Sequence, residues 1–269
     1  MRINTNTAAM NTYSRLTQAN GARSNSMAKL SSGLRINRAG DDAAGLSISE
    51  KMKNQISGLR QATRNAQDGI SLIQTAEGAL NETHSILNRM RDLSVQANNG
   101  TNADEDLAAI QAEMDELVAE LDNIAGTTQF NGTTLLDGAG VQGLTLQIGA
   151  NSGETLTLDI ADMSSTGLNV TGLDVGTDAS AAITALDKAI TTVSKQRSEL
   201  GATQNRLEHT INNLTTTKEN LSEANSRIRD VDMAEEMMEF TKNNILSQAS
   251  TAMLAQANQM PQGVLQLLG

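Results

Sequence analysis

Apolar residues recur every seven positions along two long stretches of the chain. One row consists of Met52, Leu59, Ala66, Ile73, Leu80 and Leu87, and the other of Leu186, Val193, Leu200, Leu207, Leu214, Leu221 and Ile228. A seven-residue repeat is typical of long helices that pack side by side along a seam. We therefore predict one helical rod over residues 43–99 and another that ends near Ile228.

A shorter helix is predicted between these two rods, from Asn102 to Gly126. Its apolar residues alternate in steps of three and four, at Leu107, Ile110, Met114, Leu117, Leu121 and Ile124. This spacing is that of a complete coiled-coil seam. Because only the few residues from Asn98 to Asn102 connect the helix to the first rod, we expect the two to run antiparallel.

The helical period disappears between Gly126 and about Thr177, where Gly, Thr, Asn and Asp are dense. Apolar and polar residues alternate there on either side of a Gly149–Gly153 turn, with apolar residues at Leu144, Leu146, Ile148, Leu156, Leu158 and Ile160. This alternation predicts one β-hairpin at about 133–175. An isolated hairpin is only marginally stable, so it should lie on the rods.

Both ends of the chain carry helical patterns that are out of register with the rods. Past Ile228 the apolar row shifts by three residues, and such a shift interrupts a coiled coil. The glycines from Gly33 to Gly45 separate the first rod from a weaker pattern at Ala9, Tyr13, Leu16, Ala19, Met27, Leu30 and Leu34. We predict a mainly α fold with two domains, a terminal coiled-coil domain (1–43 with 229–269) and a helical-rod domain with the hairpin (44–228).

The two ends have opposite charge. Residues 1–40 hold six Lys or Arg and no acid, whereas residues 229–269 hold two basic and five acidic residues. We therefore expect the terminal helices to pair antiparallel. Their Ala- and Met-rich faces are too poor in bulky residues to bury a core alone, so they should stay disordered until a partner covers them. The segment between the two ends is strongly acidic, which argues against nucleic acid as its partner.

Composition excludes several kinds of chemistry. The chain has no Cys, so it has neither a disulfide nor a thiolate site, and its two His residues, His84 and His209, form no zinc motif. Asp41 and Asp42 precede the first rod and are interpreted as helix caps. From this composition we expect no catalytic, metal or cofactor site. We also expect no membrane insertion, because no apolar stretch reaches about 18 residues.

Several segments resemble those of bacterial flagellins. They are Lys29 to Leu46, Gln67 to Leu80, Gln129 to Gly132, Arg206 to Leu214, Ser226 to Ala234 and Val264 to Leu268. The resemblance covers nearly the whole chain apart from about 133–180 and indicates a short member without large outer domains. It implies a subunit of the motility filament, with the terminal helices in an inner tube and the rods and hairpin in an outer tube. We expect the assembly contacts at Leu16, Leu30, Leu34, Val231, Met238, Ile245, Ala252, Val264, Leu265, Leu267 and Leu268.

The resemblance also implies partners. The chain would be exported unfolded, without a cleaved signal peptide, to the extracellular flagellum. An export chaperone would hold its C-terminal helix, and it would contact the filament cap and hook-junction proteins. The segment Asn88 to Gln96 resembles the motif that Toll-like receptor 5 recognises, which places receptor contacts at Arg89 and Leu93, with Glu113 on the next helix. Asp92 and Leu117 depart from that motif, where Glu and Arg are usual.

Four other interpretations have to be weighed against this one, and the hook-filament junction protein is the main alternative. A hook-filament junction protein shares the terminal helices, and an enzyme would need a catalytic insert larger than residues 133–180. A coiled-coil adhesin or scaffold would have no evident use for the opposite charges of the two ends. An Arg-rich, acid-free N-terminus also resembles a mitochondrial transit peptide.

Overall fold

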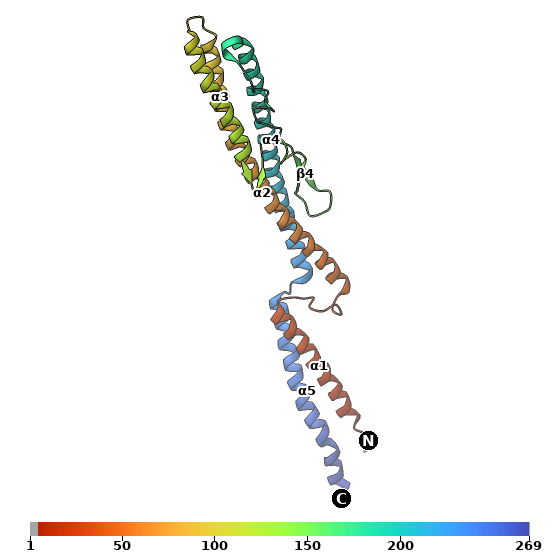
Figure 1. Ribbon diagram of the computed structural model, residues 1–269. Coiled ribbons are helices and arrows are strands. Elements are labelled where there is room, and N and C mark those ends of the chain that lie inside the picture. The colour runs from red at the N-terminus through yellow and green to blue at the C-terminus, as the bar shows by residue number, and fades with distance from the viewer. Residues whose placement is uncertain (1–4, 269) are drawn as a thin grey trace. The chain divides into compact units, whose positions relative to one another are not determined.

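The computed structural model describes residues 5–268, with the side chains of residues 5–260. Its helices are α1 (Thr7–Ser32), α2 (Ala43–Ala97), α3 (Asp104–Thr127), α4 (Val175–Arg229) and α5 (Met233–Leu268). The residues form two compact units (Figure 1). The terminal unit contains the chain up to residue 54 and from residue 220 onward, and the rod unit contains residues 55–219. The prediction of a mainly α protein with long helical rods is confirmed.

The seven-residue rows line the core of the rod unit. Leu59, Ala66, Ile73, Leu80 and Leu87 of α2 are buried, as are Leu186, Val193, Leu200 and Leu207 of α4. Met114 and Leu121 of α3 join the same apolar cluster. The short connection after Ala97 turns α3 back along α2, so the predicted antiparallel arrangement is confirmed (Figure 1).

The start of α4 is not one continuous helix. Asp178 has φ −144° and ψ 71°, outside the helical region. Its carboxylate accepts a hydrogen bond from the Ala181 amide at 3.0 Å, which is the geometry of an N-cap. The rod therefore begins after Asp178.

The predicted hairpin is formed by β3 (Leu144–Gln147) and β4 (Thr155–Leu158), with Leu144 opposite Leu158. It lies on α2, as predicted. The Asn65 side-chain amide donates to the Gln147 carbonyl at 3.0 Å. A Cβ atom at Gly69 would come within 2.7 Å of Leu146 Cδ1, so the glycine leaves room for the Leu146 side chain against α2.

A second strand pair was not predicted. β1 (Gln129–Phe130) and β2 (Thr133–Thr134) pair antiparallel across Asn131 and Gly132, both of which have positive φ. Asn-Gly between two short strands is the usual sequence of a tight hairpin turn. The expectation of one hairpin was therefore incomplete, although the turn signal was present in the sequence.

Candidate functional site

In the terminal unit, α1 and α5 run side by side in opposite directions (Figure 1). The Asn6 side-chain amide donates to the Ala257 carbonyl at 2.7 Å near one end of the pair. Lys29 Nζ lies 3.6 Å from a Glu236 carboxylate oxygen near the other end. The expected antiparallel pairing of a basic and an acidic helix is present.

The seam between these helices is made of small and polar side chains. Within Thr7–Ser32 and residues 233–260, the buried residues are Ala19, Ser26, Ser247 and Ala257. The Ser247 hydroxyl donates to the Asn20 side-chain oxygen at 2.9 Å. Such a seam removes little apolar surface from water, so it contributes little to stability.

The large apolar side chains of this unit point away from the seam. Twelve large hydrophobic residues are exposed in the described part of the chain, and ten of them lie on α1 and α5, at Met10, Tyr13, Met27, Met233, Met237, Met238, Ile245, Leu246, Met253 and Met260. Exposed apolar surface on this scale marks an interaction site in a soluble protein. We call these ten residues the outer apolar face.

The predicted assembly residues fall into two groups. Leu16, Leu30, Leu34 and Val231 are half-buried, whereas Met238, Ile245 and Ala252 are exposed. The shifted row of α5 therefore extends over its outer surface. Val264, Leu265, Leu267 and Leu268 lie outside the residues whose side chains are described.

The row of α5 that lies nearer the seam was missed. It includes half-buried Phe240 and Leu254 with buried Ser247, at a spacing of seven, and buried Ala257. The repeat was available in the sequence. Serine in the middle of an otherwise apolar row concealed it.

A shallow groove of about 400 Å³ opens on this pair of helices. It is lined by Ala9, Met10 and Tyr13 of α1 and by Leu254 and Asn258 of α5. Its position joins the seam to the outer apolar face. The groove can receive apolar side chains from a further helix.

The connections that follow α1 and α4 are tied together. Gly33 ends α1 in the left-handed conformation, at φ 71°, and Leu34 forms a β-bridge with Asp230. The Arg35 amide donates to the Arg229 carbonyl at 2.7 Å, and the Val231 amide donates to the Gly33 carbonyl at 3.1 Å. The chain that follows Gly33 is thus held to the end of α4 by backbone hydrogen bonds.

An ion pair lies next to this joint. Arg229 Nη1 is 2.6 Å from a Glu50 carboxylate oxygen. The hydrogen bond from Arg229 lowers the pKa of the Glu50 carboxyl. The Arg229 side chain is only 15% exposed, and its buried Nε has no hydrogen-bond partner among the residues whose side chains are described. The guanidinium therefore depends on Glu50 for its charge balance.

The two aspartates before α2 have different roles. Asp42 accepts a hydrogen bond from the Gly45 amide at 2.8 Å, so its predicted capping role is confirmed. Asp41 instead accepts from the backbone amides of Arg38, at 2.8 Å, and Asn37, at 3.1 Å. These two hydrogen bonds lower the pKa of the Asp41 carboxyl.

The predicted receptor-binding residues lie on α2 and α3 of the rod unit. Arg89 Nη2 lies 2.7 Å from a Glu113 carboxylate oxygen, and both side chains are about half exposed. Leu93 is only 2% exposed and belongs to the apolar core. The structure brings Arg89 and Glu113 together on the surface, whereas the Leu93 side chain faces inward.

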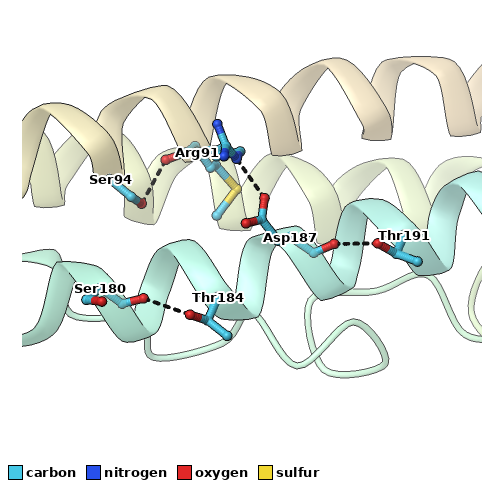
Figure 2. A network of polar contacts seen from close by, with 7 residues as sticks. Arg91, Ser94, Ser180, Thr184, Asp187 and Thr191 are labelled. Atoms are coloured by element: carbon cyan, nitrogen blue, oxygen red, sulfur yellow. Dashed lines mark hydrogen bonds and ion pairs between the residues drawn. The ribbon is translucent and has the colours of Figure 1, made fainter.

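A second ion pair joins α2 to α4. Figure 2 shows the Arg91 guanidinium directed at Asp187, with Nε 2.6 Å from Oδ1. Thr191 and Thr184 of α4 donate to backbone carbonyls four residues earlier, and Ser94 of α2 does the same. The ion pair between these two helices was not predicted from the sequence.

The described residues hold no cluster of three or more metal-binding side chains. Among them, no helix is long and apolar enough to cross a membrane. Helical rods and an end unit with an uncovered apolar face, among the described residues, are the features of a structural protein that associates with other chains.

Comparison with known proteins identifies the family. Residues 3–140 match the bacterial flagellin N-terminal helical region, and residues 183–268 match the bacterial flagellin C-terminal helical region. The chain is 59% identical to a flagellin of Halalkalibacterium halodurans and 56% identical to a flagellin of Bacillus subtilis, over the whole of each chain. The chain therefore belongs to the bacterial flagellin family.

Solved structures agree with this assignment. A crystal structure of Bacillus cereus flagellin is 38% identical, with a TM-score of 0.52, and the match covers 60% of this chain and 94% of that one. A hook-associated protein from Vibrio parahaemolyticus shares the fold at 14% identity, with a TM-score of 0.60 over 71% of this chain and all of that one. The protein is a structural subunit of the extracellular flagellar filament and not an enzyme.

Proposed function

We propose that copies of this chain polymerise for motility through the outer apolar face of α1 and α5. The observation that carries the proposal is the inverted distribution of side chains, with small and polar residues in the seam and ten large apolar residues outside it. Fully burying a Met, Leu or Ile side chain stabilises by roughly 1.5–3 kcal/mol. Ten such residues can offset the roughly 4–15 kcal/mol that association costs in lost freedom of motion.

Charge supports contacts between copies. Lys29 and Glu236 form the ion pair that joins α1 to α5. Arg15 and Arg23 of α1 form no ion pair among the described residues, nor does Glu235 of α5. Basic groups on one helix and acidic groups on the other are then available to steer neighbouring subunits together.

The test places a charge on the outer apolar face. Met238→Glu and Ile245→Glu should each abolish polymerisation after salting-out, because a carboxylate would have to be buried without a partner. The control is the Gln248→Glu variant, which carries the same added charge at an exposed polar position of α5 and should polymerise. Sedimentation and negative-stain electron microscopy measure the result, and circular dichroism checks that the helices are kept. Normal filaments from both Glu variants would overturn the proposal.

The arrangement within the filament follows from the two predicted domains. The terminal domain (1–43 with 229–269) would form the inner tube, and the rod domain with its hairpin (44–228) the outer tube. The compact units divide near residues 54 and 219, a few turns further into α2 and α4. The residues between the two sets of boundaries, about 44–54 and 219–228, would connect the inner tube to the outer tube.

Three accessory partners are proposed on the same surface. An export chaperone would hold the C-terminal helix before export and cover its apolar side chains, when the chain lacks its assembly partners. The filament cap and the hook-junction proteins would contact the same terminal helices at the two ends of the filament.

The alternative function for this chain is that of a hook-filament junction protein. Quantitative mass spectrometry of purified flagella would separate the two, because a junction protein is present only as a few copies per filament.

We also propose that Toll-like receptor 5 binds the α2–α3 surface around Arg89 and Glu113. The exposed ion pair between these side chains supports this, since it presents a fixed pattern of charge on a rigid helical scaffold. The buried position of Leu93 means that it would act by supporting Arg89 from within the core. Asp92 and Leu117 are the two departures that would weaken recognition.

A further inference from the structure

Methionine sulfur is concentrated on one surface of this molecule. The chain has twelve methionines. Seven of them are at least half exposed in the described residues, and all seven lie on α1 and α5, at Met10, Met27, Met233, Met237, Met238, Met253 and Met260. These are seven of the ten residues of the outer apolar face.

The methionines of the rod unit have the opposite environment. Met90, Met114 and Met163 are 1% exposed or less and belong to the apolar core. The sharp difference in exposure means that a reagent in solution would meet the sulfur atoms of the terminal helices first. The buried three serve as internal controls.

No residue of higher reactivity toward peroxides competes with them. The chain contains no Cys and no Trp. Methionine is therefore the residue in this protein that a mild two-electron oxidant attacks.

We propose that the seven methionines of the outer apolar face are a reversible oxidation site that controls assembly. The oxidant is a peroxide, acting on the free subunit, and the sulfoxide form does not polymerise. The inference rests on the proposed function, because it requires the same face to be covered by other copies in the filament.

The chemistry balances with hydrogen peroxide alone. A lone pair of the thioether sulfur attacks one peroxide oxygen, an S–O bond forms and the O–O bond breaks. The leaving oxygen takes up the protons as water, so methionine loses two electrons and peroxide gains them. A methionine sulfoxide reductase reverses the step, because its thiols are oxidised to a disulfide while the sulfoxide oxygen leaves as water.

The consequence for packing follows from polarity. The sulfoxide oxygen is a strong hydrogen-bond acceptor on a side chain that was apolar. Burying it against apolar side chains of another copy, without a donor, is unfavourable. Met10 illustrates the effect, since it lines the groove with Ala9, Tyr13 and Leu254.

The experiment treats the purified full-length monomer with hydrogen peroxide and maps sulfoxides by peptide mass spectrometry. The seven exposed positions should be oxidised and Met90, Met114 and Met163 should not. The critical concentration for polymerisation should rise by roughly tenfold or more, as expected when unpaired polar groups are buried. Methionine sulfoxide reductases A and B with dithiothreitol should restore the original value. Filaments treated in the same way should be protected at these positions.

A variant with leucine at all seven positions separates this inference from the proposed function. It keeps the face apolar, so it should polymerise and be insensitive to peroxide. If untreated wild-type protein polymerises but peroxide leaves its critical concentration unchanged, the oxidation site is refuted and the proposed function stands. A leucine variant that polymerises and is still inhibited by peroxide also refutes it. If repair of oxidised wild-type protein removes the sulfoxides without restoring assembly, the inference fails even where the leucine variant does not fold.

Discussion

At the scale of single residues, the receptor proposal depends on Arg89. Its guanidinium is exposed and paired with Glu113. Arg89→Ala should raise the protein concentration needed for half-maximal receptor signalling by roughly tenfold, because arginines at the centre of an interface often dominate binding. Arg60→Ala, at an exposed position of the same helix, is the matched control. A reporter-cell dose response measures signalling by both variants. Equal responses from wild type and Arg89→Ala would contradict the proposed receptor site.

The Glu50–Arg229 ion pair should make the stability of the terminal unit depend on pH. The hydrogen bond from Arg229 lowers the pKa of Glu50 in the folded protein, so its stabilisation is present above the unfolded pKa and is lost as pH falls through the lower, folded one. Glu50→Gln should therefore unfold at a lower temperature than wild type at pH 7, and the difference should shrink toward pH 3. Circular dichroism melts measure this, with Glu219→Gln as control. An equal difference at both pH values would contradict the assigned cause.

Individual residues were predicted well where a local rule applied. Asp42 caps α2 because a carboxylate before a helix can accept a hydrogen bond from a backbone amide of its first turn. Leu93 shows the limit. A motif can indicate which residues belong to a recognised segment, but whether a side chain faces α3 or solvent depends on how three helices are rotated about their axes, which the motif does not contain.

At the scale of elements, the apolar row of α4 is expected to contribute unequally along its length. Leu186 and Leu200 are 1% exposed or less, whereas Leu221 is half-buried. Leu200→Ala should lower the free energy of unfolding by about 2–5 kcal/mol, the range for a buried leucine that leaves a cavity. Leu221→Ala should cost less than half as much. Urea denaturation of the monomer, followed by circular dichroism, measures both, and equal losses would contradict the burial gradient.

The helices could be predicted because a seven-residue repeat needs no knowledge of the partner helix. Both long rods and α3 follow directly from it. The strands were harder to predict from the sequence. Leu156 and Leu158 alternate with threonines and so revealed β4, but β1 and β2 are two residues each and contain no alternation. Only the Asn131-Gly132 turn marked them. The row of α5 that lies nearer the seam was missed because Ser247 occupies a position where a coiled coil would have an apolar residue.

At the scale of the whole molecule, the two units bury apolar surface to very different extents. The large apolar core cluster lies entirely between Ala66 and Leu207, in the rod unit. The helix pair of the terminal unit buries two alanines and two serines within residues 7–32 and 233–260. The sequence indicated this difference through the scarcity of bulky residues at both ends. It could not indicate which faces of the terminal helices turn outward, because that choice depends on a seam that is held by small side chains.

This difference predicts how a protease should act on the monomer and the filament. In the monomer, residues 7–32 and 233–260 should be cut first, because their helices open at little cost in free energy, while a fragment near 55–219 should persist. In the filament, where we propose that other copies cover the outer apolar face, the ends should become resistant. Timed digestion with trypsin, which can cut at Arg15, Arg23 and Lys242, followed by mass spectrometry, measures both states. Ends as resistant in the monomer as the rods are would mean that the terminal unit is stable alone, and that assembly is not what orders it.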